Sequence, residues 1–199
     1  MFMPHRAFSP LLLCLFSLIM AVRPVFASED WVLPMEAAAW RTLTVPGARE
    51  NQFVQTGDAM RVISDNSVSF RYTELSRAID YPAQLSWRWR VDSHPPLASQ
   101  AQKGRDDRPL AVHVWFDTDG RASLFGNLAA VMGRPKVGHL LSYVWGATEP
   151  AGSVLPNPYY DKGRAIVVVG RDGRTGQWHK VRRDIAADYA RDFGTTPDM

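Results

Sequence analysis

The sequence has almost no cysteine. Cys14 is the single cysteine among 199 residues, and it lies in an apolar N-terminal stretch. A chain with one thiol forms no internal disulfide, so the packing of side chains has to supply the stability of the fold. Once that stretch is removed, no thiol nucleophile remains, which excludes the cysteine-based hydrolases.

The sequence also lacks the local motifs of other catalytic and metal-binding classes. There is no Gly-x-Ser-x-Gly turn for a serine nucleophile and no glycine-rich phosphate loop before a helix. The histidines beyond residue 27 show no metal-ligand spacing; they are His94, His113, His139 and His179. We therefore predict no metal and no cofactor. A two-carboxylate glycosidase or lyase stays open, because its acids come from distant strands and leave no local signature.

Long apolar runs are absent except at the N-terminus. Residues Ala7–Val22 are mostly apolar, and the small residues Val25 and Ala27 follow at the spacing that a signal peptidase recognises. A membrane span needs about 20 apolar residues, and proline and arginine interrupt this shorter run. We predict a signal peptide over residues 1–27, with cleavage before Ser28. Lipoprotein processing is excluded because Leu13, and not a small residue, precedes Cys14.

Removal of this leader changes the charge and places the protein outside the cytoplasm. Arg6 and Arg23 leave with it, so the formal charge falls from +3 to +1. A nearly neutral chain does not favour nucleic acid as a partner, despite the basic pI of 9.2. We expect a single periplasmic or secreted domain over residues 28–199, with no integral membrane segment after cleavage.

Apolar and polar residues alternate with a period of two through much of this domain. Five strands are predicted on that pattern or on short apolar runs: Leu85–Val91, Leu110–Phe116, Leu140–Trp145, Ala165–Val169 and Gln177–Arg182. A further hairpin is predicted from Met60 to Tyr72 around a turn at Asp65-Asn66. The fold class is therefore all-β, an antiparallel, jelly-roll-like β-sandwich. The long polar connection 92–109 should lie on the surface.

Helix signals are few. Asp184 is a candidate N-cap, and Gly194 is a candidate C-terminal glycine for a helix over Ile185–Phe193. One or two helical turns are also expected over Phe125–Met132. The fold should thus contain one short C-terminal helix beside the strands.

An ordered series of motifs resembles the bacterial exported proteins known as domain of unknown function 3047. The motifs are Leu85–Val91, Lys103–Asp107, Val114–Asp117, Leu141–Gly146, Asn157-Pro158, Gly176–Trp178, Arg183-Asp184, Asp188-Tyr189 and Phe193-Gly194. The resemblance covers residues 40–197 and implies no activity, since the family has none established. Two features depart from it: Arg105 stands where a glycine is usual, and the chain stops at Met199, before the strands expected at the C-terminus.

The best candidate site comes from strand alternation. Side chains at every second position share a face, so Arg88 and Arg90 should lie opposite the core, as should His113 and Trp115. If those two strands pair, the four side chains form one polar and aromatic surface. Tyr143 and Trp145 would extend it. Such a surface suits sugar rings; a solvated face with arginine stacked on tryptophan is the alternative.

Two smaller groups of residues complete the candidates. Asp106 and Asp107 could bind a ligand, or could cap turns and pair with the arginines beside them. Residues 117–120 resemble a fragment of a calcium loop, but we interpret them as a turn. Large aromatic side chains usually serve the core of a sandwich, and this role is predicted for Trp87, Trp89 and Trp178.

These features favour a non-catalytic, exported β-sandwich that binds an envelope or extracellular glycan. An alternative is a polysaccharide-active hydrolase or lyase that uses Asp106 or Asp107. A third hypothesis is a structural component of the envelope that pairs with other proteins through a free strand edge. The sequence alone does not choose among the three.

Overall fold

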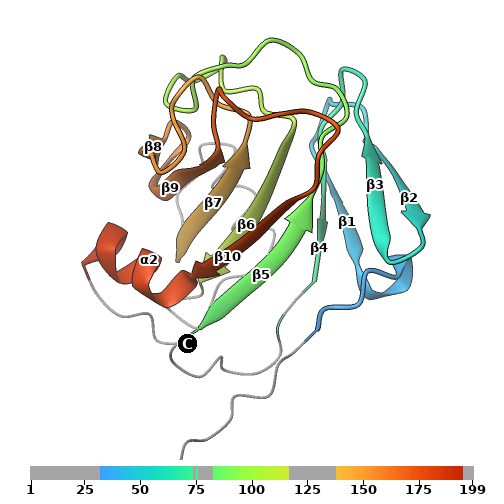
Figure 1. Cartoon of the computed structure of the whole chain (residues 1–199), viewed down its shortest axis with the longest axis horizontal. Helices are drawn as coiled ribbons and strands as arrows, with labels where there is room; N and C mark the ends of the chain where they lie inside the picture. The colour runs from blue at the N-terminus through green and yellow to red at the C-terminus, as the bar shows by residue number, and fades with distance from the viewer. Residues whose placement is uncertain (1–31, 74, 76–82, 117–137, 195–199) are drawn as a thin grey trace, which may run out of the picture.

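The computed structural model describes residues 32–73, 75, 83–116 and 138–194 (Figure 1). Its strands are β1 (Arg41–Thr44), β2 (Gln52–Thr56), β3 (Ala59–Ile63), β4 (Ser69–Tyr72), β5 (Gln84–Trp89), β6 (Leu110–Phe116), β7 (His139–Trp145), β8 (Val154–Asn157), β9 (Tyr160–Val169) and β10 (His179–Asp184). A short 3-10 segment, η1 (Ala37–Ala39), precedes β1, and the helix α2 (Ile185–Phe193) follows β10. The predicted all-β fold with a short C-terminal helix is confirmed.

The largest sheet has four strands in the order β6-β7-β9-β8. β6 with β7 and β8 with β9 are antiparallel, whereas β7 and β9 run parallel. β7 has a hydrogen-bonded neighbour on each side, and every residue from Leu140 to Trp145 is buried. A strand that is covered on both faces needs apolar residues at successive positions. This explains why residues 140–145 do not alternate and are apolar or aromatic except for Ser142, whose hydroxyl lies 2.9 Å from His113 Nδ1.

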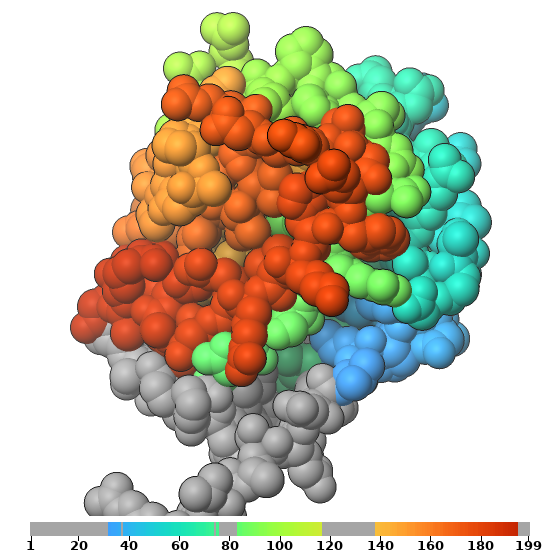
Figure 2. Space-filling view, viewed as in Figure 1, coloured from blue at the N-terminus to red at the C-terminus, as the bar shows by residue number. Residues whose placement is uncertain are grey.

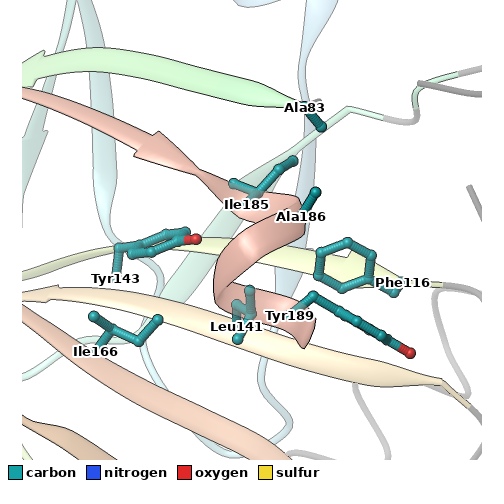
Figure 3. Close-up of a cluster of buried hydrophobic side chains, with 8 residues drawn as sticks. All are labelled: Ala83, Phe116, Leu141, Tyr143, Ile166, Ile185, Ala186 and Tyr189. Carbon is teal, nitrogen blue, oxygen red and sulfur yellow. The ribbon is translucent and has the colours of Figure 1, made fainter. Parts of the chain in front are cut away.

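A second layer, formed by β5, β10 and α2, lies in front of this sheet (Figure 1). The core between the layers contains side chains from both, and Figure 3 shows one part of it: Ala83, Phe116, Leu141, Tyr143, Ile166, Ile185, Ala186 and Tyr189. Trp89 and Val181 of the front layer form a second buried cluster with Trp145 of β7. Burial of each large apolar side chain stabilises the fold by about 1.5–3 kcal/mol. The core roles predicted for Trp87 and Trp89 are confirmed.

Local capping signals set both ends of α2. The Asp184 side chain accepts a hydrogen bond from the Ala187 backbone N–H at 2.9 Å. At the other end Gly194 has a φ of 74°, and its N–H donates to the Ala190 carbonyl. A left-handed backbone conformation is readily adopted by glycine, which explains the residue at this position. The helix occupies Ile185–Phe193, as the sequence predicts.

A buried carboxylate joins α2 to the two layers. Asp188 is 4% exposed. It accepts hydrogen bonds from the Tyr143 hydroxyl at 2.9 Å, from Arg183 Nε at 2.9 Å and from Arg191 Nη1 at 3.0 Å. A buried carboxylate is strongly unfavourable unless it is paired and hydrogen-bonded. These three donors meet that requirement, so Asp188 fixes the position of the helix.

The hairpin predicted from Met60 to Tyr72 does not form. β3 pairs with β2, and β4 pairs with β1. The short connection at Gly57-Asp58, with Gly57 at a φ of 59°, closes β2 onto β3 first. The turn predicted at Asp65-Asn66 is present, with Asn66 at a φ of 44°, but it joins strands of two different sheets.

The connection 92–109 lies on the surface, as its polarity predicts, but it is anchored at Gln100 and Ala98. Gln100 is 1% exposed, and the Ala98 carbonyl accepts from the Thr148 backbone N–H at 3.2 Å. Gly146 has a φ of 85°, and a Cβ there would lie 2.8 Å from Pro109. The absence of a side chain at Gly146 therefore lets this connection pack closely against the end of β7.

Two sequence predictions fall outside the described residues. They are the helical turns over Phe125–Met132 and the turn at 117–120. Within the ranges that the structure does describe, no helix is long and apolar enough to cross a membrane.

Candidate functional site

The outer face of the β5–β10 pair carries a group of cations. Trp89 and Val181 point to the core, so their neighbours Arg88 and Lys180 point to solvent. The antiparallel register places Lys180 directly opposite Arg88, and Arg182 opposite Ser86. Figure 2 views this face, with the side chains of β10 and of the segment before it lying beside β5.

Trp178 adds an aromatic ring to this face. Its exposed fraction is 48%, so the predicted core position is wrong. The reason is the alternation of side chains along a strand. His179 and Val181 point inward, so Trp178 lies on the outer side together with Lys180. The alternation within the predicted strand Gln177–Arg182 was enough to place Trp178 on the side opposite Val181.

Two arginines stack on the Trp178 ring. The guanidinium carbon of Arg88 lies 5.0 Å from the ring centroid, and that of Arg90 lies 5.5 Å from it. Both distances are within the range of a cation–π interaction, about 6 Å. We call this surface the basic face, defined by Arg88, Arg90, Trp178, Lys180 and Arg182.

The carboxylates around the basic face contact only part of it. Arg88 forms an ion pair with Asp58, which lies at the turn between β2 and β3. Arg90 pairs with Asp92 at 2.8 Å. Lys180 has no carboxylate partner among the described residues, nor does Arg182, whose Nε donates to the Gln84 side chain at 3.3 Å.

The single surface predicted from Arg88, Arg90, His113 and Trp115 is not formed. β5 pairs with β10, and β6 pairs with β7. The two pairs lie in different layers, and the outward face of β6 is the side of the large sheet turned away from β5. The arginines are therefore separated from His113 and Trp115 by the core.

His113 and Trp115 are both half-buried on that side of the sheet. The Nδ1 atom of His113 lies 2.9 Å from the Ser142 hydroxyl, and its ring packs edge-on against Phe70 of β4. Burial, with the nearby positive charge of Arg108, lowers the pKa of His113 to about 3. Trp115 packs against Leu140 and Tyr160, on the same side of the sheet.

Tyr143 and Trp145 do not extend any exposed surface. Their exposed fractions are 0% and 1%, and both face the core between the layers. The Tyr143 hydroxyl already donates to Asp188. Neither side chain is available to a ligand at the surface.

Asp106 belongs to a polar network that anchors the connection 92–109. The Tyr159 hydroxyl donates to Asp106 Oδ1 at 2.8 Å and accepts from the Gly104 backbone N–H at 2.8 Å. Arg108 lies 3.4 Å from Asp106 Oδ2 and donates to the Gln100 side chain at 3.2 Å. Burial and the hydrogen bond to Asp106 raise the pKa of Tyr159.

The two neighbouring aspartates do not act as a pair. Both carboxylate oxygens of Asp106 are engaged within the network, while Asp107 is exposed and contributes its backbone carbonyl to Gln100. Through its contacts with Tyr159 and Arg108, the Asp106 carboxylate holds the loop in place. Among the described residues, no group of three or more His, Asp or Glu side chains is arranged to hold a metal ion.

Comparisons with known proteins identify the family but no activity. No curated protein matches the chain, and no solved structure does. A family model described as protein of unknown function (DUF3047) matches residues 38–199, nearly all of the chain that follows the leader pattern. The motifs that carry the resemblance are part of the fold just described: β5, the loop at Lys103–Asp107, β7 and the start of α2. The chain belongs to the DUF3047 family.

Proposed function

We propose that this protein is an exported, non-catalytic binding protein that holds a glycan on the basic face. The observation that carries the proposal is the half-exposed indole of Trp178, with the guanidinium groups of Arg88 and Arg90 on its ring. This replaces the surface expected from the sequence, and it keeps the two arginines that the sequence singled out.

The chemistry of the basic face suits a sugar. The C–H face of a pyranose packs on an indole ring, and its hydroxyl groups accept hydrogen bonds from guanidinium donors. The stacked arginines restrict the motion of the ring, so less conformational entropy is lost when a ligand binds. Trp and Arg are also enriched among the residues that contribute most to binding energy at protein–protein interfaces.

The leader pattern supports an envelope or extracellular glycan as the ligand. Residues 1–27 have the apolar run and the small residues of a signal peptide. Export would bring the basic face into the periplasm or the medium, where polysaccharides are abundant. The engaged state of Asp106 gives no support to the alternative of a hydrolase or lyase built on that residue.

The first test is the change Trp178→Ala, measured on an array of neutral and acidic polysaccharides. We expect the affinity for any glycan that the wild type binds to fall about tenfold or more, since loss of a stacked ring removes about 1–2 kcal/mol. Trp178→Phe keeps a smaller ring and should retain intermediate affinity. Trp40→Ala changes a tryptophan near β1 and serves as the matched control.

Thermal melting of each variant shows whether it is folded, and Trp178 is exposed enough for its loss to be tolerated. Wild-type affinity in a folded Trp178→Ala variant would contradict the proposal. The absence of any bound glycan on the array would contradict it as well.

A further inference from the structure

The basic face is a row of cations and not an isolated pair. Lys180 and Arg182 lie on the outer side of β10, and Trp178, the residue just before this strand, precedes them at the same two-residue spacing. Successive outward residues on a strand are about 7 Å apart. Arg88 of β5 and Arg90, the residue just after this strand, continue the row next to Lys180 and Trp178. The result is a charged strip that extends along the strands.

The fold places two of these cations in an unfavourable arrangement. Lys180 and Arg88 are cross-strand partners in the register of the sheet. Like charges directly opposite each other destabilise a strand pair. The ion pair with Asp58 offsets the charge of Arg88, while Lys180 keeps its own charge uncompensated among the described residues.

The carboxylates at the border do not neutralise the row. Asp58 forms an ion pair with Arg88, and Asp92 forms one with Arg90. The Asp184 side chain caps α2. Lys180 and Arg182 are left without a carboxylate partner in the described part of the chain, although the whole sequence is nearly balanced in charge. Two uncompensated cations beside an exposed indole form a site for a ligand that is both a sugar and an anion.

We infer that the glycan bound by the basic face is an acidic polysaccharide whose sugars carry carboxylates. This inference rests on the proposed function, because it names the class of ligand for the same site. One sugar ring stacks on Trp178, and carboxylates of the same chain form charge-assisted hydrogen bonds with Lys180 and Arg182. A polymer with a regular repeat can occupy the row along the strand direction.

The experiment compares two polymers with one backbone: polygalacturonate and its fully methyl-esterified form, which is neutral. Affinity electrophoresis or titration calorimetry at low salt gives the dissociation constants. We expect the wild type to bind polygalacturonate about tenfold tighter than the ester. The difference should shrink as added salt screens the charges.

Variants test whether the cations of the basic face cause the preference for polygalacturonate over its ester. Lys180→Gln and Arg182→Gln should each lower the affinity for polygalacturonate several-fold, and should lower the affinity for the neutral ester by a much smaller factor. The matched control is Arg61→Gln, which removes one exposed cation of β3 that is not among the residues of the basic face. An equal loss in the Arg61→Gln variant would show that net charge and not the row is responsible, and would overturn the inference.

The remaining outcomes separate this inference from the proposed function. If both polymers bind equally and both need Trp178, the acidic class is wrong while the glycan site stands. If neither these polymers nor any glycan of the array is bound, both are wrong. Tighter binding of a single-stranded DNA oligonucleotide than of polygalacturonate, lost in Lys180→Gln, would assign the row to nucleic acid and overturn the inference.

Discussion

At the scale of single residues, His113 illustrates how burial controls a charge. Its ring lies between Ser142 on β7 and Phe70 on β4. Burial lowers the pKa of His113 to about 3, from an ordinary value of 6.5, so the ring is neutral in the folded protein at pH 7. The same residue in the unfolded chain takes up a proton near pH 6.5.

The sign of the resulting pH dependence follows from proton counts. Between pH 6.5 and about 3 the unfolded chain binds one more proton at this site than the folded protein does. The free energy of unfolding therefore decreases as the pH falls through this window, by at most about 1.4 kcal/mol per pH unit. Above pH 6.5 His113 contributes no slope.

We predict that His113→Asn removes this component of the slope. The measurement is the free energy of unfolding by urea at several pH values between 4 and 7. His179→Asn, a change of the other layer's histidine on β10, tests whether the loss belongs to position 113. Parallel pH profiles for the wild type and the His113→Asn variant would disprove the assignment.

At the scale of elements, the β2–β3 hairpin reaches the basic face through its turn. Asp58 at that turn forms the ion pair with Arg88. Its carboxylate makes the same kind of contact with the guanidinium group that a carboxylate of a ligand would make. Two-stranded sheets such as β2–β3 have little independent stability. If the basic face binds an acidic ligand as proposed, Asp58 of the hairpin competes with that ligand for Arg88.

We predict that Asp58→Asn raises the affinity for polygalacturonate several-fold, because it frees Arg88 and removes a repelling charge. Asp65→Asn is the matched control: its side chain is 82% exposed against 81% for Asp58, and it pairs with Arg49. The free energy of unfolding of both variants should lie within about 1 kcal/mol of the wild-type value, because exposed ion pairs contribute little to stability. An equal gain in both variants would indicate a nonspecific effect of charge.

At the scale of the whole molecule, stability depends on the packing of two layers and not on covalent links. The core between β5–β10 and the large sheet contains the fully buried side chains of Tyr143 and Trp145. The one cysteine lies within the leader pattern. The described part of the chain therefore contains no thiol, and its stability comes from side-chain packing.

Removal of the leader is itself testable. Expression of the full chain in a secreting bacterial host should give a mature protein that begins at Ser28, as measured by intact mass. Ala27→Leu should block cleavage, because signal peptidase needs a small residue at that position. Ala21→Leu makes the same change inside the apolar run and should leave cleavage intact. If the exported protein still begins at Met1, the predicted cleavage is wrong.

Features that depend only on neighbouring residues could be predicted from the sequence. The bounds of β6 and of α2 match the predicted ranges, because alternation and helix caps are local signals. The outward positions of Arg88 and Arg90 follow from the same alternation. Family membership was also readable, since it depends on the order of short motifs.

The tertiary structure alone decided which elements lie side by side. Alternation shows which residues share a face, but it does not show which strand is the neighbour. The register of Gln84 with Asp184 joins two distant segments, and it puts Lys180 and Trp178 beside Arg88. The same long-range packing buries His113 and satisfies Asp106 with Tyr159. The basic face exists because strand pairing, and not sequence order, brings its cations together.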